Sequence, residues 1–108
     1  LLLFSAGQDP GIIDPLGRNL VTKPGFEMLG AHARRLARRY TGDRLALIQE
    51  GGYQVSHLAY ATLGVLEGVL GVETGVEDPF AWLTEEPAVA ADAIAESRSD
   101  LAEYWPLS

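Results

Sequence analysis

The sequence of 108 residues contains no cysteine, which excludes a disulfide framework and any thiolate metal site. It also lacks a long hydrophobic run, because the most apolar stretch, residues 58–72, is interrupted by Glu67 and by glycines and is too short to cross a bilayer. No basic segment precedes the opening leucines, so they do not predict a signal peptide. We therefore expect a cytoplasmic protein that has no membrane partner.

Basic residues become rare after residue 44. Residues 1–44 carry seven Lys or Arg against four Asp or Glu, whereas residues 45–108 carry one against eleven, and the net charge is −7. This acidic balance argues against a nucleic-acid partner. The four arginines between residues 34 and 39 fit a local anion patch, but the solvated face of a helix is the simpler interpretation.

The first part of the chain predicts a strand, a loop and a helix. Residues 1–5, "LLLFS", form a short apolar run without alternation, which is typical of a parallel strand covered on both faces. Gly, Pro and Asp predict a loop over residues 7–21. Thr22 is placed to cap a helix whose apolar residues recur every three or four positions to about residue 41, and Gly42 ends it.

The same order then repeats. Residues 44–49, "RLALIQ", predict a second buried strand, and the tight sequence "EGGY" follows it. Ser56 is placed to cap a second helix that runs to about residue 70. The strand–helix–strand–helix order implies parallel strands joined by a right-handed crossover, so the predicted fold class is α/β.

The remaining residues, 72–108, predict a connection followed by a C-terminal helix. Thr84 and Pro87 are placed to open this helix, which ends at "YWPL". We expect residues 1–71 to belong to the α/β domain, and the last helix to pack on that domain or on a partner subunit. A homo-oligomer is therefore one of the assemblies that the sequence allows.

Each predicted strand ends in small residues followed by one reactive side chain, Asp9 after the first and Tyr53 after the second. Functional groups of open α/β sheets gather beyond the carboxyl ends of the strands, so both side chains are expected to face one crevice. A carboxylate at the end of a buried strand is costly unless it is paired or holds a metal. Taken alone, Asp9 equally fits a turn acid, and Tyr53 fits a half-buried aromatic.

Three short motifs occur in order along the chain: "SAGQD", "DPLGR" and "EGGY". Together they resemble the C-terminal part of the zinc-dependent histone deacetylase family, and most of all its bacterial class II branch of acetylpolyamine amidohydrolases and deacetylase-like amidohydrolases. The resemblance covers residues 1–71, and the ending "AEYWPL" is similar as well. It implies the parallel-sheet arginase/deacetylase-like fold, of which this chain would be the C-terminal portion.

The resemblance also implies a mechanism. Asp9 matches a zinc-binding aspartate of the family, and Zn²⁺ would be the cofactor. Tyr53 matches the tyrosine whose hydroxyl donates to the oxyanion that forms from the substrate amide. Pro15 and Leu16 match positions that line the channel for the substrate. Gly51 and Gly52 match glycines that bring the backbone close to the substrate and allow the loop of Tyr53 to move. The substrate would be a small acylated amine or acetyl-lysine.

The sequence departs from the family in two places. Gln8 stands where many members have Phe, and residues 54–63 match no relative closely, which leaves the substrate preference open. The other zinc ligands and the catalytic histidines of the family have no counterpart here. His32 and His57 are better explained as structural residues, and the Asp-Pro sequence at Asp14 indicates a turn acid.

One carboxylate does not hold a catalytic zinc, which needs about three protein ligands. The favoured hypothesis is that these residues supply one zinc ligand and the oxyanion donor of a longer hydrolase, and that the 108 residues alone are inactive. The alternative is a non-catalytic fragment or degenerate relative that binds an anion or a partner. A nucleotide-binding unit fits worst, because "EGGY" lacks the spacing of a phosphate-binding loop.

Overall fold

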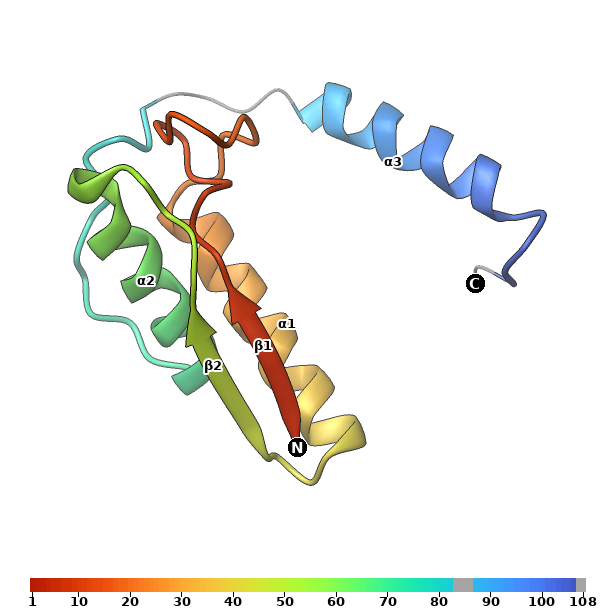
Figure 1. Cartoon of the computed structure of the whole chain (residues 1–108), viewed down its shortest axis with the longest axis horizontal. Helices are drawn as coiled ribbons and strands as arrows, with labels where there is room; N and C mark the ends of the chain where they lie inside the picture. The colour runs from red at the N-terminus through yellow and green to blue at the C-terminus, as the bar shows by residue number, and fades with distance from the viewer. Residues whose placement is uncertain (83–86, 107–108) are drawn as a thin grey trace.

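The predicted α/β order is confirmed by a computed structural model, which describes residues 1–82 and 87–106. Along these described residues the elements follow in the order β1, α1, β2, α2, α3 (Figure 1). Their bounds are Leu2–Ala6 (β1), Lys23–Tyr40 (α1), Leu45–Gln49 (β2), Val55–Leu70 (α2) and Pro87–Leu101 (α3). The predicted opening of the third helix at Thr84 lies outside the described residues.

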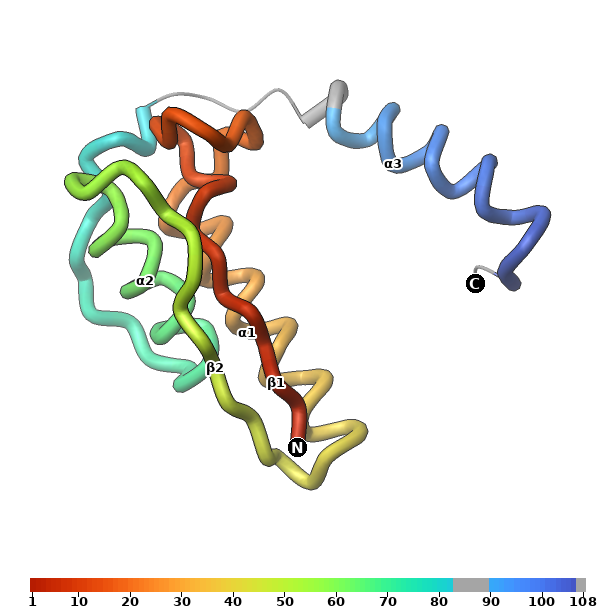
Figure 2. The backbone as a smooth tube through the Cα atoms, in the orientation of Figure 1, coloured from red at the N-terminus to blue at the C-terminus, as the bar shows by residue number. Residues whose placement is uncertain are grey.

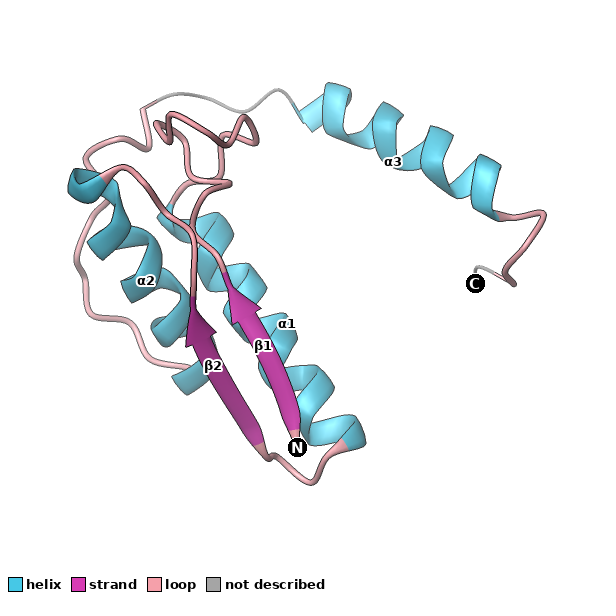
Figure 3. Ribbon diagram, in the orientation of Figure 1, coloured by secondary structure: helices cyan, strands magenta, loops and turns pink. Residues whose placement is uncertain are grey.

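The two strands form a parallel pair in which Leu2 lies opposite Leu45 and Ala6 lies opposite Gln49. Helix α1 makes the crossover between them and lies behind both strands, and α2 packs beside it (Figure 3). Because the strands are parallel and in register, they end at the same edge of the sheet. The loops that follow them therefore begin side by side.

The expectation that both strands are covered on both faces is wrong for this structure. Leu3 is 61% exposed and Ile48 is 48% exposed, on the face that points away from α1. The reason is that α1 packs on one side of the strands and α2 packs against α1, so the described residues cover only that side.

The core lies between α1 and α2, where it contains three buried side chains, Phe26, Ala61 and Val65. Glycines bring the two helices into close contact. A Cβ atom at Gly64 would lie 2.5 Å from the carbonyl oxygen of Lys23, and one at Gly68 would overlap the carbonyl oxygen of Glu27. The glycines that interrupt the apolar stretch in the sequence are therefore the positions at which the helix backbones meet.

Thr22 precedes α1 as predicted, but its side chain makes no capping hydrogen bond. The backbone N–H of Lys23 instead donates to Asp78 Oδ2 at 2.9 Å. A carboxylate is favourable at a helix N-terminus because the first amides lack partners within the helix. An acid 55 residues away thus performs the capping that the sequence assigned to Thr22.

The predicted cap at Ser56 is wrong, because the helix is capped two residues earlier, by Gln54, and α2 begins at Val55. The side-chain oxygen of Gln54 accepts hydrogen bonds from the backbone N–H of Ser56 at 3.0 Å and from its hydroxyl at 2.9 Å. Glutamine is not among the preferred capping residues, so the sequence pattern did not indicate that the helix starts after Gln54.

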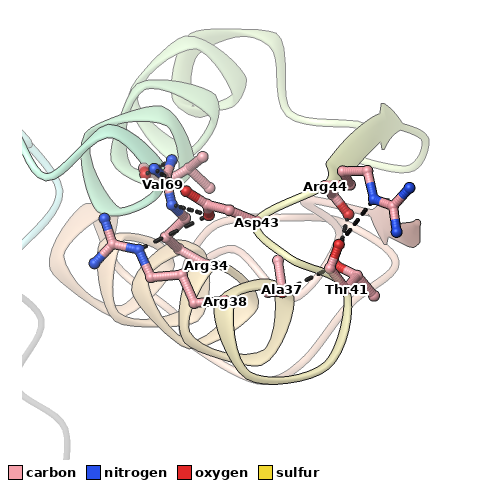
Figure 4. A network of polar contacts seen from close by, with 7 residues as sticks. All are labelled: Arg34, Ala37, Arg38, Thr41, Asp43, Arg44 and Val69. Carbon is pink, nitrogen blue, oxygen red and sulfur yellow. Dashed lines mark hydrogen bonds and ion pairs between the residues drawn. The ribbon is translucent and has the colours of Figure 1, made fainter.

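Helix α1 ends as predicted next to Gly42, which adopts φ of +60°. Asp43 follows with φ of +67° and accepts a hydrogen bond from Arg34 Nη2 at 2.9 Å (Figure 4). The Nε atom of Arg34 lies 2.6 Å from Asp43 Oδ1 in an ion pair. Arg34 Nη1 also donates to the carbonyl oxygen of Val69 at the end of α2. One of the four clustered arginines therefore fastens this turn to α2 and does not face solvent freely.

The connection after α2 runs back along the helix pair towards the N-terminal end of α1, as Figure 2 traces. It is held there by the buried carboxylate of Glu67, which pairs with Lys23 Nζ at 2.5 Å and accepts a hydrogen bond from the backbone N–H of Thr74 at 2.9 Å. The hydrogen bonds from Lys23 and then Thr74 lower the pKa of Glu67 to about 2.

This depressed pKa predicts a stability that depends on pH. Glu67 has a lower pKa in the folded state than in the unfolded chain, so its contribution is complete above the ordinary value of 4.5 and is lost as the pH falls towards about 2. Between about pH 5 and about pH 3 we expect the Tm of the full-length protein to fall more steeply than the Tm of its Glu67→Gln variant. Thermal unfolding followed by circular dichroism measures both slopes, with Glu96→Gln on the exposed face of α3 as the matched control. Equal slopes for all three proteins would contradict the role of Glu67.

Helix α3 exposes every side chain that is described between residues 90 and 101. Its packing on the domain or on a partner subunit stays a prediction. Among the described residues, no helix is both long enough and apolar enough to cross a membrane.

Candidate active site at the carboxyl ends of the strands

The loops that follow β1 and β2 are joined by backbone hydrogen bonds. The N–H of Gln8 donates to the carbonyl oxygen of Gly51 at 3.0 Å, and the N–H of Glu50 donates to that of Ala6 at 3.3 Å. These bonds continue the pairing of the strands beyond the sheet. The two loops that carry the predicted site residues therefore lie against each other.

Asp9 is half-buried and its carboxylate lies against two glycines. A side chain at Gly51 would overlap Asp9 Oδ1, and a Cβ atom at Gly7 would lie 2.7 Å from the same oxygen. Within residues 1–82 and 87–106, no hydrogen bond or ion pair occupies this carboxylate. Asp9 thus presents a carboxylate oxygen in a space that side chains at Gly7 and Gly51 would fill.

Tyr53 follows Gly51 and Gly52, and its side chain is 58% exposed. Gly52 has φ of +118°, a backbone conformation that other residues rarely adopt. The backbone N–H of Tyr53 donates to Asp14 Oδ2 at 2.7 Å. The tyrosine is therefore placed by its main chain, while its phenol ring extends into solvent.

The carboxylate of Asp14 closes the turn that the sequence predicted. Asp14 Oδ1 accepts hydrogen bonds from the backbone N–H groups of Leu16 at 2.8 Å and Gly17 at 3.0 Å. Burial alone raises the pKa of this carboxyl, but the backbone amides of Tyr53, Gly17 and Leu16 outweigh that effect and hold the pKa below its usual value. Its bond to Tyr53 has no local sequence signal, because 39 residues separate the two.

Pro15 and Leu16, the predicted substrate-contacting residues, lie on the exposed turn that Asp14 closes. Leu16 is 69% exposed. Through Asp14 this turn is connected to the backbone of Tyr53. The structure thus brings the turn and the tyrosine loop together, and contact of Pro15 and Leu16 with a substrate stays a prediction.

Gln8, which departs from the family pattern, supports the glycine loop from below. Its side chain is buried, and its Oε1 accepts a hydrogen bond from Gln49 Nε2 at 3.2 Å. A Cβ atom at Gly52 would lie 3.0 Å from the Cβ atom of Gln8. A hydrogen bond between the buried amide of Gln8 and the exposed amide of Gln49 therefore lies next to the loop that carries Tyr53.

His57 is buried in the first turn of α2, as expected for a structural residue. Its Nε2 lies 3.2 Å from Asp78 Oδ2, and its ring contacts the rings of Phe26 and Phe80. A Cβ atom at Gly11 would lie 2.8 Å from His57 Nδ1. This histidine thus fixes the start of α2 against the loop that contains Asp9. His32, by contrast, is exposed, and its Nδ1 lies 2.8 Å from the carbonyl oxygen of Met28 on its own helix.

The carboxylate of Asp78 connects these elements. Burial raises its pKa, but the N–H groups of Lys23 and Phe80 and the imidazole of His57 outweigh this, so the pKa stays below its usual value. Asp78 therefore joins α1, α2 and the connection through its contacts with Lys23, His57 and Phe80. No local sequence pattern indicates this role, because the partners of Asp78 lie 55 and 21 residues away.

Comparison with known proteins decides the family. The model of the histone deacetylase domain matches residues 1–69. The chain belongs to the histone deacetylase family. The resemblance of its three short motifs is thereby confirmed.

The relatives are much longer than this chain. It is 36% identical over 107 residues to histone deacetylase 8 of Arabidopsis thaliana, an alignment that covers 98% of the chain and 28% of the relative. It is 31% identical over 110 residues to the histone deacetylase-like amidohydrolase of Pseudomonas aeruginosa, with 99% and 29% covered. To the human polyamine deacetylase HDAC10 it is 32% identical over 108 residues, with 97% and 15% covered. The chain therefore spans less than a third of each of these histone deacetylase relatives.

Proposed function

We propose that this member of the histone deacetylase family supplies one zinc ligand, Asp9, and one oxyanion donor, Tyr53, to an enzyme that hydrolyses an acylated amine. The observation that carries the proposal is the meeting of the two loops, with the Asp9 carboxylate against Gly51 and Tyr53 two residues further on. The motif resemblance implies family roles for both residues, and both follow parallel strands at one edge of the sheet.

The residues present fit one ligand position of a zinc site. Asp9 offers a carboxylate oxygen, which is an accepted ligand of Zn²⁺, and the neighbouring glycines leave room beside it. The described residues hold no group of three or more His, Cys, Asp or Glu that would bind a metal. The remaining ligands would come from outside these 108 residues. Zinc, when bound, polarises the amide carbonyl and lowers the pKa of water.

The tyrosine loop has its own part in the proposed reaction. The hydroxyl of Tyr53 donates a hydrogen bond to the oxygen on which negative charge develops as the amide is attacked. Gly51 leaves space for the Asp9 carboxylate, and Gly52 allows the backbone to turn so that the ring extends outwards. Pro15 and Leu16 would contact the chain of the acylated amine from the adjoining turn.

The proposed substrate is an amide of a primary amine, such as acetyl-lysine or an acetylpolyamine. One relative is named an amidohydrolase and another a polyamine deacetylase, and the shared chemistry is the hydrolysis of an acyl–amine bond. Soluble small molecules or acetyl-lysine side chains are the proposed partners. A second copy of the chain is a further proposed partner, through α3.

Acetate release tests the proposed function. Full-length protein loaded with zinc is expected to release acetate from an acetyl-lysine peptide or from an acetylpolyamine. The activity is expected to disappear on chelation and to return when zinc is added back. Acetate measured by a coupled enzymatic assay separates the two substrates. A zinc-loaded, folded protein that releases no acetate from either would contradict the proposal.

A further inference from the structure

One carboxylate joins the two loops of the candidate site. Asp14 Oδ2 accepts the backbone N–H of Tyr53 at 2.7 Å, while Oδ1 accepts the N–H groups of Leu16 and Gly17 at 2.8 Å and 3.0 Å. The carboxylate therefore spans from the turn after β1 to the loop after β2. Both of its oxygens are engaged by main-chain donors.

Tyr53 needs such an anchor because little else holds it. Two glycines precede it, and Gly52 lies in a region of backbone space that is open to glycine alone. The phenol ring is 58% exposed, so packing does not fix it. The carbonyl oxygen of Gly51 accepts a hydrogen bond from the N–H of Gln8. Among the described residues, the group that binds the N–H of Tyr53 is the carboxylate of Asp14.

We propose that Asp14 is a positioning residue for the reaction, which sets the phenol of Tyr53 and the turn of Leu16 in a fixed relation to each other. The inference rests on the proposed function, since the placement of Tyr53 matters for turnover only if its hydroxyl stabilises the reacting oxygen. Asp14 touches neither the substrate nor the metal in this account. It acts through the main chain of Tyr53.

The expected effect follows from the chemistry of the bond. A hydrogen bond to a charged acceptor is among the stronger ones in proteins, and a misplacement of about 1 Å in an active site lowers turnover by on the order of 100-fold. We therefore expect Asp14→Asn to lower kcat by on the order of 10- to 100-fold in the full-length, zinc-loaded protein. Its KM is expected to change less, because Asp14 makes no contact with the amine chain in this account.

Asp14→Asn is the informative variant because it keeps the volume of the side chain. The asparagine amide has a single oxygen, which accepts hydrogen bonds either from the N–H groups of the turn or from the N–H of Tyr53. Its NH₂ group then faces the remaining N–H donors and accepts no hydrogen bond from them. Asp92→Asn is the matched control, since Asp92 is exposed on α3. The control is expected to leave kcat unchanged.

A double-mutant cycle separates positioning from a general loss of structure. In the Tyr53→Phe background the hydroxyl is absent, so its placement no longer matters. Adding Asp14→Asn there is expected to change kcat by no more than about twofold, whereas the same change in the wild type is much larger. If Asp14→Asn lowered kcat equally in both backgrounds, the positioning role would be wrong.

Amide hydrogen exchange tests the inference without any activity. The N–H of Tyr53 is expected to exchange at least about tenfold faster in Asp14→Asn, while the strand amides of β1 and β2 keep their protection. An unchanged rate at Tyr53 would overturn the proposal. If the wild-type protein releases no acetate, the proposed function and the positioning role in turnover are both wrong. If Tyr53→Phe lowers kcat but Asp14→Asn does not, only the positioning role is wrong.

Discussion

Replacing Tyr53 by phenylalanine is expected to lower kcat of the full-length, zinc-loaded protein by on the order of 10²–10³. The change removes one hydroxyl and leaves the ring and the main chain. Because the N–H of Tyr53 still donates to Asp14, the loop keeps its anchor and the loss reports the hydroxyl itself. The zinc content is expected to stay at the wild-type level, since the tyrosine is not a proposed ligand.

Tyr40→Phe is the matched control for this experiment. Tyr40 is 68% exposed at the end of α1, next to the start of the strands and away from their carboxyl ends. Its ring faces the guanidinium of Arg39 at 5.1 Å, a contact that phenylalanine keeps. Steady-state kinetics of the wild type, Tyr53→Phe and Tyr40→Phe, at matched zinc content, compare their kcat values. Turnover by Tyr53→Phe at the wild-type rate would remove the tyrosine from the mechanism.

The second large effect is expected at Asp9. Asp9→Ala is predicted to weaken zinc binding by more than about 100-fold, because the loss of groups that merely support a ligand already costs about 10- to 100-fold. The side chain lies between Gly7 and Gly51, so its removal leaves space and creates no clash. Activity is expected to fall with the zinc content.

Zinc content after dialysis against a weak chelator measures this effect directly. Asp92→Ala removes a carboxylate from the exposed face of α3 and serves as the control, with zinc expected at the wild-type level. Asp9→Ala protein that retained one zinc per chain through the same dialysis would show that Asp9 is not a ligand. Unchanged circular dichroism of the variant would show that the loss of zinc is not a loss of fold.

Much of the fold was predictable because its signals are local. Apolar runs of strand length, the three- and four-residue period of the helices and Gly42 all lie within a few residues of what they specify. Parallel pairing then followed from the element order, and with it the side-by-side position of the loops that carry Asp9 and Tyr53. The sheet-edge argument therefore predicted correctly that these two loops lie side by side, and that they form the active site stays a prediction.

The features that the sequence did not predict depend on distant partners. Asp78 caps α1 from 55 residues away, so the residues around the first turn of α1 do not indicate which group caps the helix. Asp14 looked like a turn acid, and half of its carboxylate does serve the turn, but its second oxygen holds Tyr53 across 39 residues. The exposure of Leu3 could not be foreseen either, because an apolar strand looks the same whether one or both faces are covered.

The central claim, that Asp9 and Tyr53 flank one zinc centre, is tested most directly by a crystal structure of the full-length protein with zinc and an uncleavable acylated amine. Anomalous diffraction at the zinc edge locates the metal without assumption. We expect the zinc at about 2.0–2.2 Å from a carboxylate oxygen of Asp9 and the Tyr53 hydroxyl at about 2.6–3.2 Å from the carbonyl oxygen of the amide. A zinc bound elsewhere, or an amide carbonyl that Tyr53 does not reach, would contradict the account.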